Sequence, residues 1–134
     1  MVEMGREAQG YASAMGLSKP AAAGPLKFGK FDLDPSQVFF ASDAGLSLAI
    51  VNLKPLVPGH VMVIPRRVAP RMGELTAEEL EDLWRTVRHV QGVVQEFHGA
   101  SCATLGVQDG KDAGQSVPHV HVHILPVHGA RSSL

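Results

Sequence analysis

One segment of the chain, residues 76–99, has the pattern of a long amphipathic helix with a defined start and end. Thr76 and Glu79 have the spacing of a capping box, in which each side chain accepts a hydrogen bond from an otherwise unpaired backbone amide of the first turn. Gly99 stands where a glycine commonly ends a helix. Apolar residues recur at helical spacing and are expected to form one buried stripe, namely Leu80, Leu83, Trp84, Val87, Val94 and Phe97.

The segments on either side of this helix have the apolar, β-branched composition of short strands. A turn-forming stretch at residues 42–45, "SDAG", predicts a hairpin between the first two of them. Strands followed by one long helix and then more strands predict an α+β domain, in which the amphipathic helix packs on a mostly antiparallel sheet of about five strands. The expected strands lie within residues 37–41, 46–53, 60–67, 101–108 and 119–126.

The remaining features of the chain limit its organisation and its partners. Residues 1–25 are rich in Ala, Gly and Ser without a sustained period, so we expect an N-terminal extension outside the core and a domain at residues 26–134. The balance of 12 basic and 13 acidic residues argues against a nucleic-acid polymer as partner. No apolar run is long enough for a membrane span. Cys102 cannot form an internal disulfide, which favours a reducing, cytoplasmic compartment.

Residues 119–126, "HVHVHILP", place three histidines at every second position. On a strand, such residues point to the same face, so His119, His121 and His123 are expected to project together. One interpretation gives the histidines no functional role and takes the segment as a half-exposed strand that happens to carry them. The residues expected to face the opposite way, into the core beneath the helix, are Val120, Val122 and Ile124.

A metal site is a second interpretation of the three histidines. The Cα atoms of His119 and His123 lie about 13 Å apart on a strand, and a histidine Cα lies at most about 6.5 Å from a bound metal. The three side chains therefore cannot surround one ion tetrahedrally. Two of them together with His60 could still bind zinc.

A phosphate-transfer site is the third interpretation. A neutral imidazole is a competent nucleophile toward phosphorus, provided that an acceptor holds its other ring nitrogen and that nearby donors stabilise the phosphate oxygens. The middle histidine, His121, suits this role best. The preceding loop, "DAGQSVP", can offer backbone amides, the Gln115 amide and the Ser116 hydroxyl to a phosphate.

This combination resembles the histidine triad (HIT) superfamily, and in particular its fragile histidine triad branch. The resemblance rests on "LKFGKF", "LAIVNLKPLVPGHVMVIPRR", "VQDG" and "GQSVPHVHVHILP", and covers roughly residues 26–127. It implies a HIT-like fold and a nucleotide-binding homodimer that hydrolyses dinucleoside polyphosphates, typically diadenosine triphosphate to AMP and ADP, through a nucleotidyl-histidine intermediate. It implies no tightly bound metal, although Mg or Mn can accompany the polyphosphate.

The resemblance also assigns roles to residues. It places His121 as the nucleophile and His60 as a fourth histidine beside it, while His119 and His123 order the site and contact phosphate. Implied nucleotide contacts are Phe28, Leu33 and Ile50 around the base, Asn52 at the ribose, Gln108 near the nucleotide, and Gly114, Gln115, Ser116, Val117 and His123 at the phosphates.

Two alternatives to this activity remain open from the sequence. The first is a related HIT reaction, such as adenylyl phosphoramidate hydrolysis or nucleotidyl transfer to phosphate. The second is a nucleotide-binding signalling protein with slow turnover. Among the other residues, we expect Cys102 to be a small core residue, and His89 and His98 to lie at the surface or to cap the helix.

Overall fold

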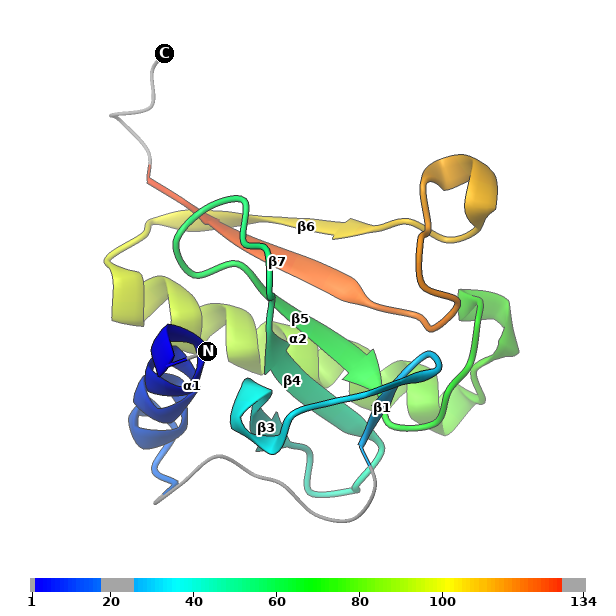
Figure 1. The fold of residues 1–134 in the computed structure, drawn as a ribbon, viewed down its shortest axis with the longest axis horizontal. Helices are drawn as coiled ribbons and strands as arrows, with labels where there is room; N and C mark the ends of the chain where they lie inside the picture. The colour runs from blue at the N-terminus through cyan, green and yellow to red at the C-terminus, as the bar shows by residue number, and fades with distance from the viewer. Residues whose placement is uncertain (1, 18–25, 129–134) are drawn as a thin grey trace.

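The computed structural model describes residues 2–17 and 26–128, with side chains from Gly5 onwards. Two helices and a five-stranded sheet form the body of the molecule, and a two-stranded hairpin lies beside them (Figure 1). The helices and strands are α1 (Val2–Ala14), β1 (Lys27–Phe28), β2 (Phe31–Asp32), β3 (Val38–Ala41), β4 (Ser47–Val51), β5 (Val61–Pro65), α2 (Ala77–His98), β6 (Cys102–Val107) and β7 (Val122–Val127).

The large sheet has the strand order β3-β4-β5-β7-β6, and every neighbouring pair is antiparallel. Its two faces are covered by different elements, which explains why all five residues of β4 are buried. Ala49 and Val51 pack into the cluster that contains α1 and α2, whereas Leu48 and Ile50 pack into a second cluster with Phe28 of β1. The predicted α+β class and the antiparallel five-stranded sheet are confirmed.

Helix α2 begins and ends as the sequence predicts. Both hydrogen bonds of the capping box between Thr76 and Glu79 are present, and Gly99 closes the helix in the left-handed region with φ of 66°. The predicted stripe is correct at its centre but too wide. Leu83, Val87 and Val94 are buried together with Val90, whereas Leu80, Trp84 and Phe97 are 40%, 37% and 49% exposed. The sheet therefore covers only the middle of the apolar face, and the flanking large side chains stay at its rim.

Helix α1 was not predicted, and it contributes directly to the core. Ala8, Tyr11 and Ala12 are fully buried in the same cluster as residues of α2 and the sheet. The Tyr11 ring lies 4.9 Å from the Phe39 ring, and its hydroxyl is 2.7 Å from Nε2 of His98. The expectation that the N-terminal segment lies outside the core is therefore wrong for these residues. Residues 18–25 lie outside the described part of the chain, and the domain boundary at residue 25 stays a prediction.

Three further residues test the expectations about individual side chains. His89 is exposed, as predicted. His98 is instead half-buried, because Tyr11 of α1 and Gly59 of the loop before β5 lie against its ring. Cys102 is exposed and unpaired rather than part of the core, since it begins the edge strand β6.

Within residues 2–17 and 26–128, no helix has the length and apolar content needed to cross a membrane.

Candidate active site

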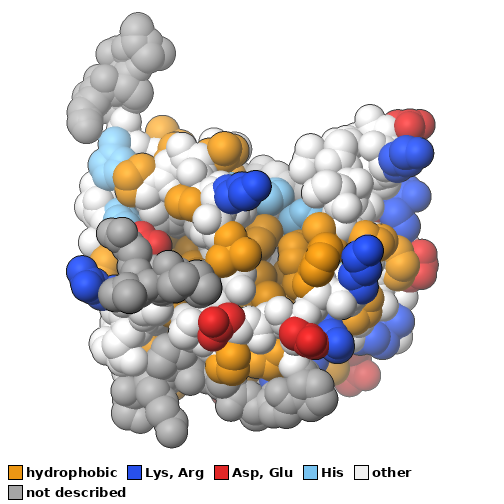
Figure 2. All heavy atoms as spheres, viewed as in Figure 1, with side chains coloured by type: hydrophobic (Ala, Val, Ile, Leu, Met, Phe, Trp, Pro, Cys, Tyr) orange, Lys and Arg blue, Asp and Glu red, His pale blue; other side chains and the backbone are white. Residues whose placement is uncertain are grey.

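The four histidines singled out by the sequence lie along the paired strands β5 and β7. His119 and His121 lie in the segment just before β7, His123 lies in β7 beside Met62 of β5, and His60 immediately precedes β5. On this face, Figure 2 shows histidine side chains in a hollow that hydrophobic side chains border. The intervening Val120, Val122 and Ile124 are buried in the core beneath, as predicted.

The His119 ring is completely buried, and both of its nitrogens are used within the protein. Nδ1 accepts a hydrogen bond of 2.9 Å from the backbone amide of Gly29, so the proton belongs on Nε2, which donates to the Pro65 carbonyl at 2.8 Å. Burial lowers the pKa of His119 and favours this neutral form. His119 therefore ties the β1–β2 turn to the end of β5. Its ring has no free donor for a phosphate, so of the two predicted roles the ordering of the site is the one that fits.

His121 has the tautomer that a nucleophile needs. Its Nδ1 lies 2.7 Å from the carbonyl oxygen of His119, and a carbonyl can only accept, so Nδ1 carries the proton. Nε2 then holds the lone pair, and it makes no hydrogen bond to any described residue. The Phe28 ring lies nearly perpendicular to the imidazole, with ring centroids 5.0 Å apart. The predicted acceptor for the second nitrogen is thus a backbone carbonyl two residues away.

His60 and His123 form a hydrogen-bonded pair beside His121. The Leu56 amide donates to Nδ1 of His60 at 3.1 Å, which leaves the proton on Nε2. This Nε2 donates to Nδ1 of His123 at 2.9 Å, so a neutral His123 carries its own proton on Nε2. Burial, followed by the nearby His121 and His60, lowers the pKa of His123 to about 4. At neutral pH, His123 therefore offers one uncharged N–H donor.

The predicted phosphate loop, residues 114–117, is held in place by Gln115. The Gln115 Oε1 atom accepts from the Gly110 amide at 2.8 Å, and its Nε2 donates to the carbonyls of Pro70 and Val117 at 2.8 and 3.0 Å. Both polar atoms of the Gln115 side chain are therefore hydrogen-bonded within the protein. The amide that was expected to face a phosphate holds the loop in its conformation instead. Ser116 is exposed and free of hydrogen bonds to the described residues.

Two glycines allow this loop to approach its neighbours closely. Gly114 has φ of 94°, and a Cβ there would collide with the Gln108 amide. Gly29 has φ of 61°, and a Cβ there would lie 2.7 Å from the Val117 side chain. The loop is thereby packed against both the end of β6 and the β1–β2 turn. Gln108 is exposed beside Gly114.

A cavity of about 460 Å³ opens next to the histidines, between the β1–β2 hairpin and the sheet. Four of the predicted nucleotide contacts line it, namely Phe28, Leu33, Asn52 and Val117. Ile50 does not, because it is fully buried in the core beneath the cavity floor. Lining residues that the sequence did not reveal are Phe31, Asp32, Gln37, Leu53, Lys54 and Met62.

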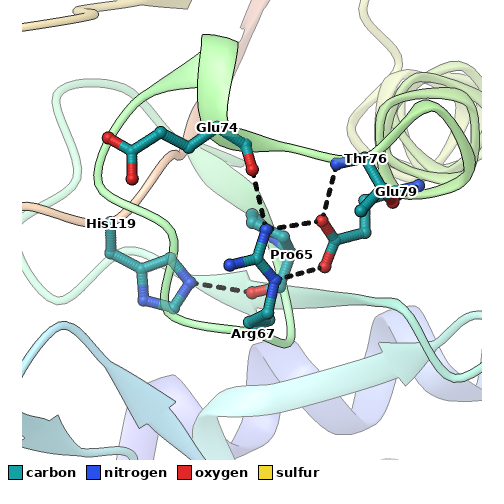
Figure 3. Close-up of polar contacts among 6 residues, drawn as sticks. All are labelled: Pro65, Arg67, Glu74, Thr76, Glu79 and His119. Carbon is teal, nitrogen blue, oxygen red and sulfur yellow. Dashed lines mark hydrogen bonds and ion pairs between the residues drawn. The ribbon is translucent and has the colours of Figure 1, made fainter.

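An ion pair between partly exposed Arg67 and buried Glu79 lies near the chain segment that binds His119 (Figure 3). Arg67 donates from Nε and from an η nitrogen to the two carboxylate oxygens of Glu79, each at 2.8 Å. The hydrogen bonds from Arg67, and then that from the Thr76 amide, lower the pKa of Glu79 to about 2. This pair fixes the chain two residues after Pro65, whose carbonyl accepts from His119. The spacing of Thr76 and Glu79 predicts a capping box but not this ion pair, because Arg67 lies outside the helix.

The described side chains do not form a metal site. Within these residues, no three His, Cys, Asp or Glu side chains are arranged so that they could hold an ion. His119 uses both ring nitrogens on backbone groups, and His60 donates to His123. The pairing of two triad histidines with His60 around zinc therefore has no support in this geometry.

Comparison with known proteins identifies the family. Residues 34–130 match the family model described as HIT domain. The chain belongs to the HIT domain family. This HIT domain is 54% identical over 102 residues to the bifunctional bis(5'-adenosyl)-triphosphatase/adenylylsulfatase FHIT of Arabidopsis thaliana, a match that covers 76% of the chain and 56% of the relative. The predicted resemblance to the fragile histidine triad branch is confirmed.

Two further comparisons agree with this assignment. The HIT domain is 55% identical over 101 residues to the asymmetrical bis(5'-nucleosyl)-tetraphosphatase of Schizosaccharomyces pombe, covering 75% of the chain and 54% of the relative. The crystal structure of Plasmodium falciparum diadenosine triphosphate hydrolase in complex with Cyclomarin A superimposes with a TM-score of 0.78 at 27% identity, over 92% of the chain and 83% of that protein. The chain spans about half the length of the Arabidopsis and Schizosaccharomyces relatives.

Proposed function

We propose that this HIT domain hydrolyses dinucleoside polyphosphates, with diadenosine triphosphate cleaved to AMP and ADP through a nucleotidyl-histidine intermediate. The observation that carries the proposal is the state of His121. Its Nδ1 donates to a backbone carbonyl, which leaves a lone pair on Nε2. Support for the substrate class comes from the names of the relatives, which include a bis(5'-adenosyl)-triphosphatase and a bis(5'-nucleosyl)-tetraphosphatase.

The proposed reaction has two steps. Nε2 of His121 attacks the α-phosphorus, and a P–N bond forms while the bond to the departing ADP oxygen breaks. The His119 carbonyl stabilises the imidazolium that results, because it already accepts from Nδ1. Water then attacks the same phosphorus, the P–N bond breaks, AMP leaves and the water proton passes to solvent. The N–H of His123 is the donor available to the oxygens around the reacting phosphorus.

The cavity next to His121 provides the nucleoside site in this proposal. Phe28 and Leu33 offer apolar walls for the base, and Asn52 lies between the cavity and His60, where it can meet a ribose. In this proposal, the exposed Ser116 hydroxyl and the loop around it bind phosphate oxygens. We propose no tightly bound metal. Mg²⁺ or Mn²⁺ enters only with the polyphosphate, whose charge it neutralises.

We also propose that the protein works as a homodimer in a reducing, cytoplasmic compartment. The support is the edge strand β6, which has an exposed Leu105 and a free, exposed Cys102. An unpaired edge of this kind is a natural surface for a two-fold contact. Light scattering should give twice the chain mass at micromolar concentration, and a monomer would contradict the proposal.

A turnover assay tests the proposed activity. Purified protein should convert diadenosine triphosphate to equal amounts of AMP and ADP, identified by chromatography. The same preparation should be offered diadenosine tetraphosphate and adenosine 5'-phosphoramidate in parallel. Faster cleavage of the phosphoramidate would favour the related HIT reaction, and nucleotide binding without turnover would favour a signalling protein.

A further inference from the structure

One polar side chain in the cavity wall is buried and held in a single orientation. Gln37 ends a short 3₁₀ helix, Pro35–Gln37, and is 5% exposed. The other polar residues that line the cavity are Asp32 and Lys54, which are exposed, and Asn52, which is half-buried. A buried polar group among apolar walls is the kind of feature that gives a ligand pocket its specificity.

The Val51 carbonyl fixes which way the Gln37 amide points. Nε2 of Gln37 lies 3.0 Å from this oxygen. A carbonyl can only accept a hydrogen bond, so the NH₂ group must face it and the amide cannot turn over without placing two oxygens together. The Oε1 atom and the second N–H of Gln37 have no partner among the described residues.

The free oxygen of Gln37 is not sealed inside the protein. Among the described residues, Ser47 Oγ is the one side-chain nitrogen or oxygen that is both fully buried and unpaired. Oε1 of Gln37 therefore keeps contact with open space, and the space that Gln37 borders is the cavity. The fixed amide thus presents its Oε1 acceptor to whatever occupies the cavity.

We propose that Gln37 selects the base of the nucleotide, in favour of adenine. Adenine carries an exocyclic amine, which can donate a hydrogen bond to Oε1. Hypoxanthine has a carbonyl oxygen in place of that amine. If it bound in the same position, this oxygen and Oε1 would face each other as two acceptors. The inference rests on the proposed function, because it assumes that the cavity receives the base of a nucleotide.

The expected size of the effect follows from the burial of the amide. A site with a buried polar group discriminates strongly against an analogue that leaves the group unpaired. For a single amide that retains its bond to the protein, we expect kcat/KM to be about ten- to a hundredfold higher for the adenine substrate than for the hypoxanthine one.

The test compares diadenosine triphosphate with diinosine triphosphate in wild type, Gln37→Met and Gln91→Met. Methionine keeps the length of glutamine without its polar groups, and Gln91, which bonds Gln95 on α2, provides the control far from the cavity. Wild type and Gln91→Met should prefer adenine by the factor given above, whereas the preference in Gln37→Met should fall to less than about threefold. Because each ratio is taken within one protein, partial misfolding of a variant does not alter it.

Calorimetric binding of AMP and IMP separates this inference from the proposed activity. If wild-type protein hydrolyses neither substrate, the proposed function fails, yet tighter binding of AMP than of IMP that depends on Gln37 would still support base selection. If Gln37→Met does not fold, the comparison of AMP with IMP binding to the wild-type protein still tests the inference. Equal affinity or equal turnover for the two bases in wild type, or an unchanged preference in Gln37→Met, would overturn the inference.

Discussion

The ion pair between Arg67 and Glu79 should stabilise the fold in a way that depends on pH. The folded protein lowers the pKa of Glu79 from 4.5 to about 2. A shift of that size corresponds to at most about 3 kcal/mol of unfolding free energy. The Glu79 side chain is 8% exposed, but Arg67 is 51% exposed and therefore partly screened. We accordingly expect Glu79→Gln to cost about 2 kcal/mol at pH 7.

The sign of the pH dependence follows from the lowered pKa. A carboxyl group with a depressed folded pKa stabilises the native state above its unfolded pKa, and this contribution is lost as the pH falls toward the folded pKa. The difference between wild type and Glu79→Gln should therefore be largest near neutral pH. It should shrink from pH 4.5 downward and largely vanish near pH 2.

Urea unfolding of both proteins at a series of pH values measures this difference. Glu81→Gln is the matched control, because Glu81 lies on the same helix and pairs with Arg85 in an exposed i,i+4 bridge. The control should lose less than about 0.5 kcal/mol. An equal loss in both variants, or a Glu79→Gln penalty that is the same at pH 7 and pH 2.5, would refute the reasoning.

Two further outcomes are expected. Tyr11→Phe should lower the unfolding free energy by about 1 kcal/mol in urea titrations, because it removes a buried hydrogen bond to His98; an unchanged stability would argue against the docking of α1. Burial lowers the pKa values of His60, His119 and His123, to about 4 for His123, so these three groups favour the native state above their unfolded pKa and lose this effect as the pH falls. The unfolding free energy of the wild-type protein should therefore decline from about pH 6.5 downward, with a slope of about 1.4 kcal/mol per pH unit for each extra proton bound on unfolding. An unfolding free energy that stays constant between pH 6.5 and 4 would contradict the neutral state of these three histidines.

Local patterns in the sequence predicted the parts of the fold that depend on neighbouring residues. The capping box at Thr76 and Glu79 and the closing Gly99 all occupy the expected places. The sequence pattern did not predict helix α1, because its buried face consists of only Ala8, Tyr11 and Ala12 among small residues. Its packing depends on aromatic rings that are distant in the chain. The exposure of Cys102 likewise depends on which strand forms the edge of the sheet, and short apolar runs do not reveal strand order.

The site was predictable in its residue types but not in its hydrogen bonds. Alternation predicted one strand carrying all three histidines, but β7 begins at Val122, so His119 and His121 lie before it. The state of His119 depends on Gly29 and Pro65, which lie 90 and 54 positions away in the chain. The commitment of Gln115 to its own loop and the fixed orientation of Gln37 are also products of tertiary contacts, and no sequence spacing encodes them.

Trapping of the covalent intermediate tests the central claim, that His121 is the nucleophile. Wild-type protein mixed rapidly with diadenosine triphosphate labelled at the α-phosphate should carry label that survives alkaline denaturation and is released by acid. His121→Asn removes the attacking nitrogen, so it should carry no label and should lose several orders of magnitude in turnover while it still binds nucleotide. His119→Asn and His123→Asn should lose less, because they keep that nitrogen and disturb only its surroundings. Labelling of His121→Asn at the wild-type level, or turnover close to that of wild type, would contradict the account.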